Sequence, residues 1–184
     1  KFNQAGWNNW PELYKKRDIP TLRHAREELA QEIAVIKFTQ FVFFTQWLAL
    51  KKYANEKGVA LFGDIPIFVA YDSADVWSQP HLFKLDAEQN MTVVAGVPPD
   101  YFSADGQLWG NPLYKWSAHQ AEGFAWWKSR LRKTLEMVDI VRIDHFRGFA
   151  GYWEIPASEP TAVNGRWLPG PGEPLFKAIN KALG

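Results

Sequence analysis

The stretch that decides the fold of this chain is VDIVRIDHFRG, residues 138–148. Its first half is rich in branched apolar residues, which is typical of a strand, and the strand ends in Asp144. A carboxylate at the end of a buried strand is costly unless a cation holds it ionised or a reaction uses it. Asp144 is therefore either half of a structural ion pair, with Arg142 close by in the sequence, or a reactive group.

A second strand is predicted within VALFGDIPIFVA, residues 59–70. This stretch is apolar on both faces, as in a parallel strand that helices cover on both sides. Pro66 cannot donate a ladder hydrogen bond, so the pairing should end near Asp64. Asp64 and Asp144 would then both lie at the carboxyl ends of consecutive parallel strands, the edge at which α/β folds hold their sites.

Good helix formers fill residues 21–57 and predict one long helix, or two with a break, that stops at Gly58. The most apolar part, residues 33–50, is interrupted by Lys37 and two glutamines. A membrane span would have to bury these polar side chains at its centre, so we interpret the segment as a helix that faces a core.

Helical spacing returns at residues 119–137 and again at about 174–183. Residues 71–115 and the stretch that follows Gly148 are rich in glycine, proline and aromatic residues, and we predict long loops there. The alternation of helix, strand and loop predicts an α/β fold with a parallel sheet. We find no linker, so residues 1–184 are expected to form a single segment without a separate second domain.

Composition excludes several classes of function. The chain has 21 Lys plus Arg and 20 Asp plus Glu, so no strong field exists to attract nucleic acid or an anionic membrane. It has no cysteine, which excludes disulfides and cysteine-ligated zinc and fits a reducing compartment, so we expect a cytoplasmic protein. The first residues carry no signal-peptide pattern and no Met, and we interpret them as a cut or processed end.

The predicted loops contain a set of residues suited to sugars. Flat aromatic rings stack on sugar faces and short polar side chains bind hydroxyl groups. The rings are Tyr101, Phe102, Trp109 and Trp167, and the polar groups are Asp100, Gln107, Asn111 and Arg166. The alternative is that one of the rings merely packs its loop down. His145 has no second metal ligand at a recognised spacing, so we expect a hydrogen-bonding histidine, with no metal and no cofactor.

Five motifs together resemble the 4-α-glucanotransferases, also called amylomaltases or disproportionating enzymes, which form glycoside hydrolase family seventy-seven. They are DIPIFVA at 64–70, DSADVW at 72–77, GVPPDYFS at 96–103, GQLWGNP at 106–112 and RIDHFRG at 142–148. The resemblance runs from Trp7 to the end of the chain.

The resemblance implies a (β/α)₈ barrel that transfers α-1,4-glucan segments between maltooligosaccharides by a retaining double displacement. By motif position, Asp144 would be the nucleophile and Arg142 the cation that orients it and keeps it ionised. Substrate would be bound by Asp100, Tyr101, Phe102, Gln107 and Trp109 on a mobile loop, and we add Asp64, Asn111, His145 and Trp167 as candidates. At 184 residues the chain is short for a closed barrel of about 250, so we expect a partial barrel with about the third and fourth strands and their helices.

Two motifs of the family are missing, the one that holds its general acid/base and a later one in which a transition-state aspartate follows a histidine. The general acid/base of the family is a glutamate in a Glu-Asp-Leu-Gly motif, and none of Glu154, Glu159 and Glu173 matches it. We therefore expect this segment alone to be inactive, and its open sheet edges to favour self-association. Two other functions stay open: an α-amylase-type hydrolase and a non-catalytic glucan-binding module.

Overall fold

The structure is a computed structural model in which residues 2–184 are described. The chain divides into two compact units. The first takes in the chain up to Asp64 together with Lys133–Arg142, and the second consists of Ile65–Arg132 and Ile143–Gly184.

The first unit begins with short helices and continues into a long one. They are η1 (Trp7–Asn9), α1 (Glu12–Lys15), α2 (Ile19–Glu28) and α3 (Ala30–Glu56). Asp18 caps α2 by accepting a hydrogen bond from the backbone N–H of Thr21 at 2.9 Å. The stretch forms two helices with a break at Leu29, which is one of the two arrangements left open, and Gly58 follows α3 with a φ of +74°, so the predicted glycine stop is confirmed.

The long helix α3 buries none of its residues, so the prediction that it faces a core is wrong for this chain. By length and composition alone, α3 could cross a membrane. Its contacts within the unit come from one half-buried face. There the indole N–H of Trp47 donates to the carbonyl of Met137 at 2.7 Å, and Lys51 donates to the carbonyl of Val138 at 2.9 Å. Among residues 2–184, no second helix covers the remaining apolar side chains of α3.

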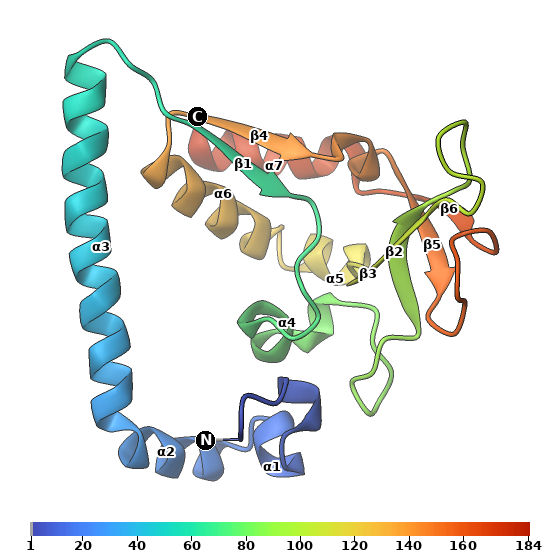
Figure 1. Cartoon of the computed structure of the whole chain (residues 1–184), viewed down its shortest axis with the longest axis horizontal. Helices are drawn as coiled ribbons and strands as arrows, with labels where there is room; N and C mark the ends of the chain where they lie inside the picture. Colours follow the sequence, from blue (N-terminus) through green and yellow to red (C-terminus); the bar gives the residue numbers. More distant parts are fainter. Residues whose placement is uncertain (1) are drawn as a thin grey trace. The chain divides into compact units, whose positions relative to one another are not determined.

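Strands β1 (Phe62–Pro66) and β4 (Ile140–Asp144) form a two-stranded sheet, and their arrows point the same way (Figure 1). Strand β1 ends at Pro66, two residues beyond the predicted end of the pairing. In both strands exposed residues alternate with less exposed ones, so the prediction that β1 is covered on both faces is wrong. Within the described residues each of these strands has a single neighbour, which leaves the outer edge of each strand open.

The second unit contains a four-stranded antiparallel sheet that the sequence analysis placed in loops. Its strands lie in the order β3 (Gln107–Pro112), β2 (Val93–Val97), β5 (Gly151–Pro156) and β6 (Arg166–Pro169). The loop prediction failed because these strands are short and interrupted by glycine and proline. Gly96 shows why: a Cβ there would lie 2.3 Å from the carbonyl oxygen of Gln107 on the neighbouring strand.

Helices complete the fold. They are α4 (Ala74–Ser78), η2 (Pro80–Leu82), α5 (Trp116–Ala121), α6 (Ala125–Met137), η3 (Phe146–Phe149) and α7 (Gly172–Leu183). The helix predicted at 119–137 is interrupted at Gly123 and Phe124, which both have a φ of +58°. The terminal helix is confirmed as α7, which buries Leu175 and Ile179. The architecture is α/β, as predicted.

The core of the second unit is largely aromatic. Tyr114 is 1% exposed, and its ring centroid lies 4.9 to 5.5 Å from those of Phe83, Trp116, Trp126 and Trp127. Trp126 and Trp127 are both buried in this core. Much of the tryptophan content is therefore explained by packing.

Candidate active site

In the first unit, Arg142 on β4 binds Asp64 on β1. Its Nε donates to Asp64 Oδ1 at 3.1 Å, and its Nη2 forms a second, short hydrogen bond to Oδ2. This bidentate geometry fits a guanidinium to a carboxylate across two neighbouring strands. The ion pair that the sequence offered to Asp144 is therefore made with Asp64. Both side chains are partly exposed to solvent.

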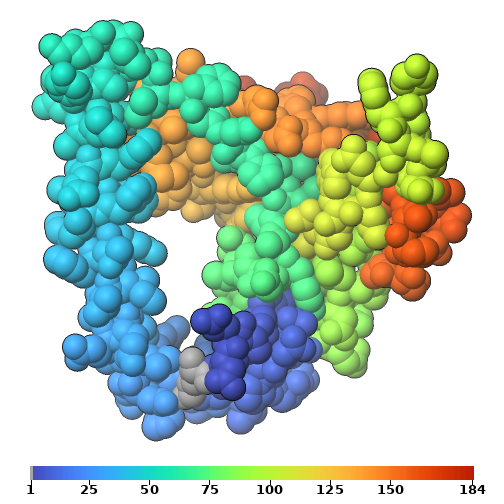
Figure 2. Space-filling model, in the orientation of Figure 1, coloured from blue at the N-terminus to red at the C-terminus, as the bar shows by residue number. Residues whose placement is uncertain are grey.

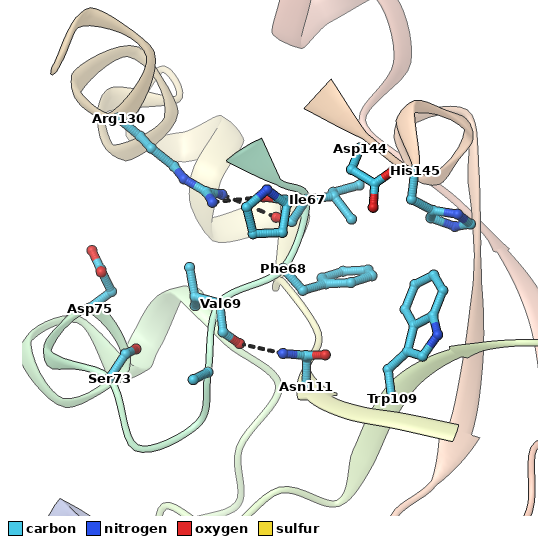
Figure 3. Close-up of a pocket in the computed structure, with 12 residues that line it drawn as sticks. Ile67, Phe68, Val69, Ser73, Asp75, Trp109, Asn111, Arg130, Asp144 and His145 are labelled. Atoms are coloured by element: carbon cyan, nitrogen blue, oxygen red, sulfur yellow. Dashed lines mark hydrogen bonds between the residues drawn. The ribbon is translucent and has the colours of Figure 1, made fainter. Parts of the chain in front are cut away.

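In the second unit, Asp144 and His145 line a pocket of about 500 Å³ together with Phe68, Trp109 and Asn111 (Figure 3). This volume lies within the usual range for sites that bind small molecules. Among residues 2–184, no hydrogen bond or ion pair engages the carboxylate of Asp144, which is exposed in the pocket. A carboxylate with both oxygens uncommitted can accept a hydroxyl group or attack an electrophilic carbon.

His145 directly follows the strand and has a left-handed backbone with a φ of +51°. Its ring meets the edge of Trp109, with the ring centroids 4.8 Å apart. Burial lowers the pKa of His145, opposed by the charge of Asp144 and assisted by that of Arg147. Its neutral form is thereby favoured beside the carboxylate, where it can donate and accept hydrogen bonds.

Strand β3 presents three of the predicted substrate-binding residues. Trp109 faces the pocket, and its indole N–H donates to Gln107 Oε1 at 3.0 Å (Figure 3). The amide of Asn111 donates to the carbonyl of Val69 at 3.0 Å. Gln107 thus steadies the indole, and Asn111 tethers the opposite wall of the pocket.

Asp100, Tyr101 and Phe102 lie on the turn between β2 and β3, outside the pocket lining. Tyr101 is 97% and Phe102 91% exposed, and Figure 2 shows this yellow-green turn projecting from the unit. Asp100 Oδ1 accepts hydrogen bonds from the backbone N–H groups of Phe102 and Ser103, each at 2.9 Å. The carboxylate therefore shapes the turn that displays the two rings.

Trp167 lies on β6, also outside the pocket lining. Its ring centroid is 5.4 Å from that of Trp153, and the guanidinium of Arg147 lies 4.6 Å from its centroid. Cation–π stacking and the neighbouring indole therefore hold the ring of Trp167 at the surface of the small sheet.

Sequence reasoning did not select several residues that line the pocket. These are Phe68, Arg130 and the Ser73–Asp75 turn, and Asp75 accepts a hydrogen bond from Trp126 Nε1 at 3.0 Å. Ser73 caps α4. Phe68 lies in the DIPIFVA motif and the turn lies in the DSADVW motif, so these two motifs could have pointed to them, whereas Arg130 lies in none of the five motifs.

A second carboxylate, Glu154 on β5, was also missed as a structural group. It is 3% exposed, and Lys84 and Arg166 donate to it at 2.5 Å and 2.6 Å. Burial alone would raise the pKa of Glu154, but the hydrogen bonds from the two cations outweigh this and lower it. Arg166, expected to bind a hydroxyl group, is bound to Glu154 instead. Among residues 2–184 no group of three histidine or carboxylate side chains is arranged to hold a metal ion.

Comparison with known proteins gives one consistent answer. The family model described as 4-alpha-glucanotransferase matches residues 1–184. The 4-alpha-glucanotransferase of Thermus thermophilus is 57% identical over 97% of this chain and 36% of its own length. That of Streptococcus pneumoniae serotype 4 is 50% identical over the whole chain, again 36% of its own length.

The structural comparison agrees. The amylomaltase from Streptococcus agalactiae, solved in complex with acarbose, superposes with a TM-score of 0.94 at 44% identity, covering all of this chain and 37% of that one. The chain thus spans about a third of the length of the relatives it matches. This chain belongs to the 4-alpha-glucanotransferase family.

Proposed function

We propose that this chain is part of a protein of its relatives' length, called the whole protein below, and that the whole protein transfers α-1,4-glucan segments from a donor to an acceptor sugar. The 36% of relatives' length that the chain covers supports the first part. In this proposal β1 and β4 are neighbouring strands, about the third and fourth, of a (β/α)₈ barrel. The open outer edges of the two-stranded sheet support this, because a closed barrel gives each strand two neighbours.

The observation that carries the proposal is the uncommitted carboxylate of Asp144 in a pocket with an aromatic wall. In the first step an oxygen of Asp144 attacks the anomeric carbon, while the bond from that carbon to the leaving sugar breaks. The leaving oxygen takes a proton from a general acid. In the second step an acceptor hydroxyl attacks the same carbon, the bond to Asp144 breaks, and the acceptor's proton returns to the base.

The other residues have supporting roles in this proposal. Trp109 offers a ring to the sugar, and His145 a hydrogen bond to a sugar hydroxyl. Arg142 holds Asp64 at the end of β1 and supplies positive charge at the acidic edge of the sheet. Tyr101 and Phe102 would close over the bound sugar and exclude water, which favours an acceptor sugar over hydrolysis.

The general acid lies outside this chain in the proposal, because Glu154, the one buried glutamate among residues 2–184, is held by two cations. The 184-residue segment by itself should therefore not turn over maltotriose. Turnover by the purified segment would contradict this placement of the acid.

Maltotriose as sole substrate tests the proposed function. A transferase yields glucose together with maltooligosaccharides longer than maltotriose, measured by chromatography of the products of the whole protein. A hydrolase yields glucose and maltose alone, and a glucan-binding module binds the sugar without forming any product. Either of the last two results would contradict the proposal.

A further inference from the structure

The wall of the pocket opposite Asp144 is a short segment, Pro66–Ala70, that leaves the end of β1. Strand β1 ends at Pro66, so among the described residues the carbonyl groups that follow have no partner in a strand ladder. The segment nevertheless holds Ile67 and Phe68 buried, at 2% and 6% exposure. Side chains from other elements must therefore bind its backbone.

Arg130 on α6 is the centre of this binding. Its Nη2 donates to the carbonyl of Pro66 at 2.7 Å, and its Nη1 donates to that of Ile67 at 3.2 Å (Figure 3). Tyr114 donates from its hydroxyl to the same Ile67 carbonyl at 2.7 Å. With Asn111 on Val69, three side chains bind the carbonyl groups of Pro66, Ile67 and Val69.

The guanidinium of Arg130 is itself fixed by stacking. It lies 5.3 Å from the ring centroid of Trp126 and 5.0 Å from that of Trp127, both buried. A planar cation stacked on indoles can direct two N–H groups at two carbonyl oxygens at once. A lysine ammonium, a flexible point charge, cannot reproduce that geometry.

The Pro66–Ala70 segment packs against the residues that directly follow Asp144. A Cβ at Gly148 would lie 2.7 Å from Ile67 Cδ1 and 3.1 Å from the ring of His145, so these groups are in close packing. On the other side, Phe68 lies 6.4 Å from Trp109, which meets His145. A shift of the segment would therefore move the aromatic wall and His145 relative to Asp144.

We infer that Arg130 is a positioning residue for the reaction, acting through the Pro66–Ala70 segment rather than by contact with the reacting atoms. The inference rests on the proposed function. A displacement of about 1 Å in such a wall can cost about 100-fold in rate, because the sugar must meet the carboxylate in one geometry. The effect should fall mainly on kcat, because misalignment of the wall and the carboxylate weakens the transition state more than the bound ground state.

The test compares Arg130→Met with Arg132→Met in the whole protein, because Arg132 is exposed on the same helix. We expect Arg130→Met to lower kcat for maltotriose transfer by about 10- to 100-fold per folded molecule, with KM changed less than threefold. Arg130→Lys should recover only part of this loss, and Arg132→Met should match the wild type. Adding methylguanidinium to Arg130→Ala should raise kcat, whereas methylammonium should not.

Two outcomes would overturn the inference. One is a folded Arg130→Met protein whose kcat equals that of Arg132→Met, which would leave Arg130 a purely stabilising role. If Arg130→Met does not fold, Arg130→Lys decides, and wild-type kcat in that variant would be the contradicting result. An inactive wild-type protein would instead contradict the proposed function, so the two failures are distinguishable.

Discussion

The two sheets of this chain differ in how complete they are. The antiparallel sheet of β2, β3, β5 and β6 finds all its partners within residues 93–169, and Ala95 and Ile155 at its centre are 0% exposed. The pair of β1 and β4 has exposed residues along both strands. Antiparallel strands close through short turns, whereas parallel strands need crossover connections and further chain. The antiparallel sheet thus finds its partners within this chain, whereas the outer edges of the β1–β4 pair have none among the described residues.

The carboxylates on the two sheets differ in the same way. Glu154 lies on the antiparallel sheet and is enclosed between Lys84 and Arg166. Asp144 lies at the end of the open pair, in a pocket, with no hydrogen-bond partner among the described residues. The comparison teaches that a charge with all its partners supplied stabilises the fold, while a charge without them is available for chemistry.

The largest expected effect is on catalysis. Asp144→Asn in the whole protein should lower the rate of maltotriose transfer by about 10⁴-fold or more, because the amide cannot form the glycosyl intermediate. The midpoint of thermal unfolding should change by no more than a few degrees, since no hydrogen bond is lost. Product chromatography, calorimetric unfolding and binding of maltotriose measure the three properties. Unchanged turnover would reject Asp144 as the nucleophile.

The next effect is on stability. Glu154→Gln should lower the free energy of unfolding by about 3 kcal/mol or more, because it leaves Lys84 beside an uncharged buried group. Transfer activity per folded molecule should stay within about twofold. Urea unfolding measures the change, and Glu173→Gln, exposed on α7, is the control with an expected loss below about 0.5 kcal/mol. A Glu154→Gln protein that is as stable as the wild type but inactive would show that Glu154 serves the reaction rather than the fold.

A third effect concerns pH. Burial lowers the pKa of His119 to about 4, from about 6.5 in the unfolded chain. Between these values the unfolded state binds a proton that the folded state does not. The stability from the neutral ring is therefore complete above pH 6.5 and falls as the pH drops to 4, by about 3 kcal/mol.

His119→Phe should remove this part of the pH dependence, whereas His24→Phe, at an exposed position on α2, should retain it. Urea unfolding at pH 7 and at pH 4.5 measures the slope. Equal slopes in His119→Phe and in the wild type would show that the buried ring does not carry it.

The smallest effect is expected at the exposed turn. Tyr101→Ala should change the free energy of unfolding by less than about 0.5 kcal/mol, because the ring is 97% exposed. The ratio of transfer to hydrolysis should fall several-fold, since the turn would then exclude water less well. The ratio of transfer to hydrolysis is measured by comparing the amount of longer maltooligosaccharides with the number of new reducing ends. Val163→Ala, at another exposed position, is the control. A ratio equal to that of the control would remove Tyr101 from the acceptor site.

Sequence patterns predicted the parts of the fold that local chemistry determines. The glycine stop after α3, the approximate end of β1, the end of β4, and α7 all depend on residues within a few positions of the feature. The small antiparallel sheet was not predicted from sequence. Gly96 is required there because the backbone of the neighbouring strand approaches too closely for a Cβ, and this contact is visible only in three dimensions. The exposure of α3 depends on which other elements cover it, and no pattern within the helix encodes that.

The candidate site divides in the same manner. The positions of Asp144 and His145 follow from the end of a strand, and the structure places both in the pocket with Trp109 and Asn111. Arg130 lies 14 residues before Asp144 on a helix of ordinary composition, so only the three-dimensional structure connects it to the Pro66–Ala70 segment. The pairing of Arg142 with Asp64 needed the register between β1 and β4, which their sequences do not specify.

The most direct test of the account is to trap the intermediate on Asp144. A fluorinated maltosyl donor, whose covalent intermediate is slow to break down, is incubated with the whole protein, and the peptides are then analysed by mass spectrometry. We predict one added glycosyl mass, located on Asp144 and absent from the Asp144→Asn variant. A glycosyl group on any other residue, Glu154 included, would contradict the account.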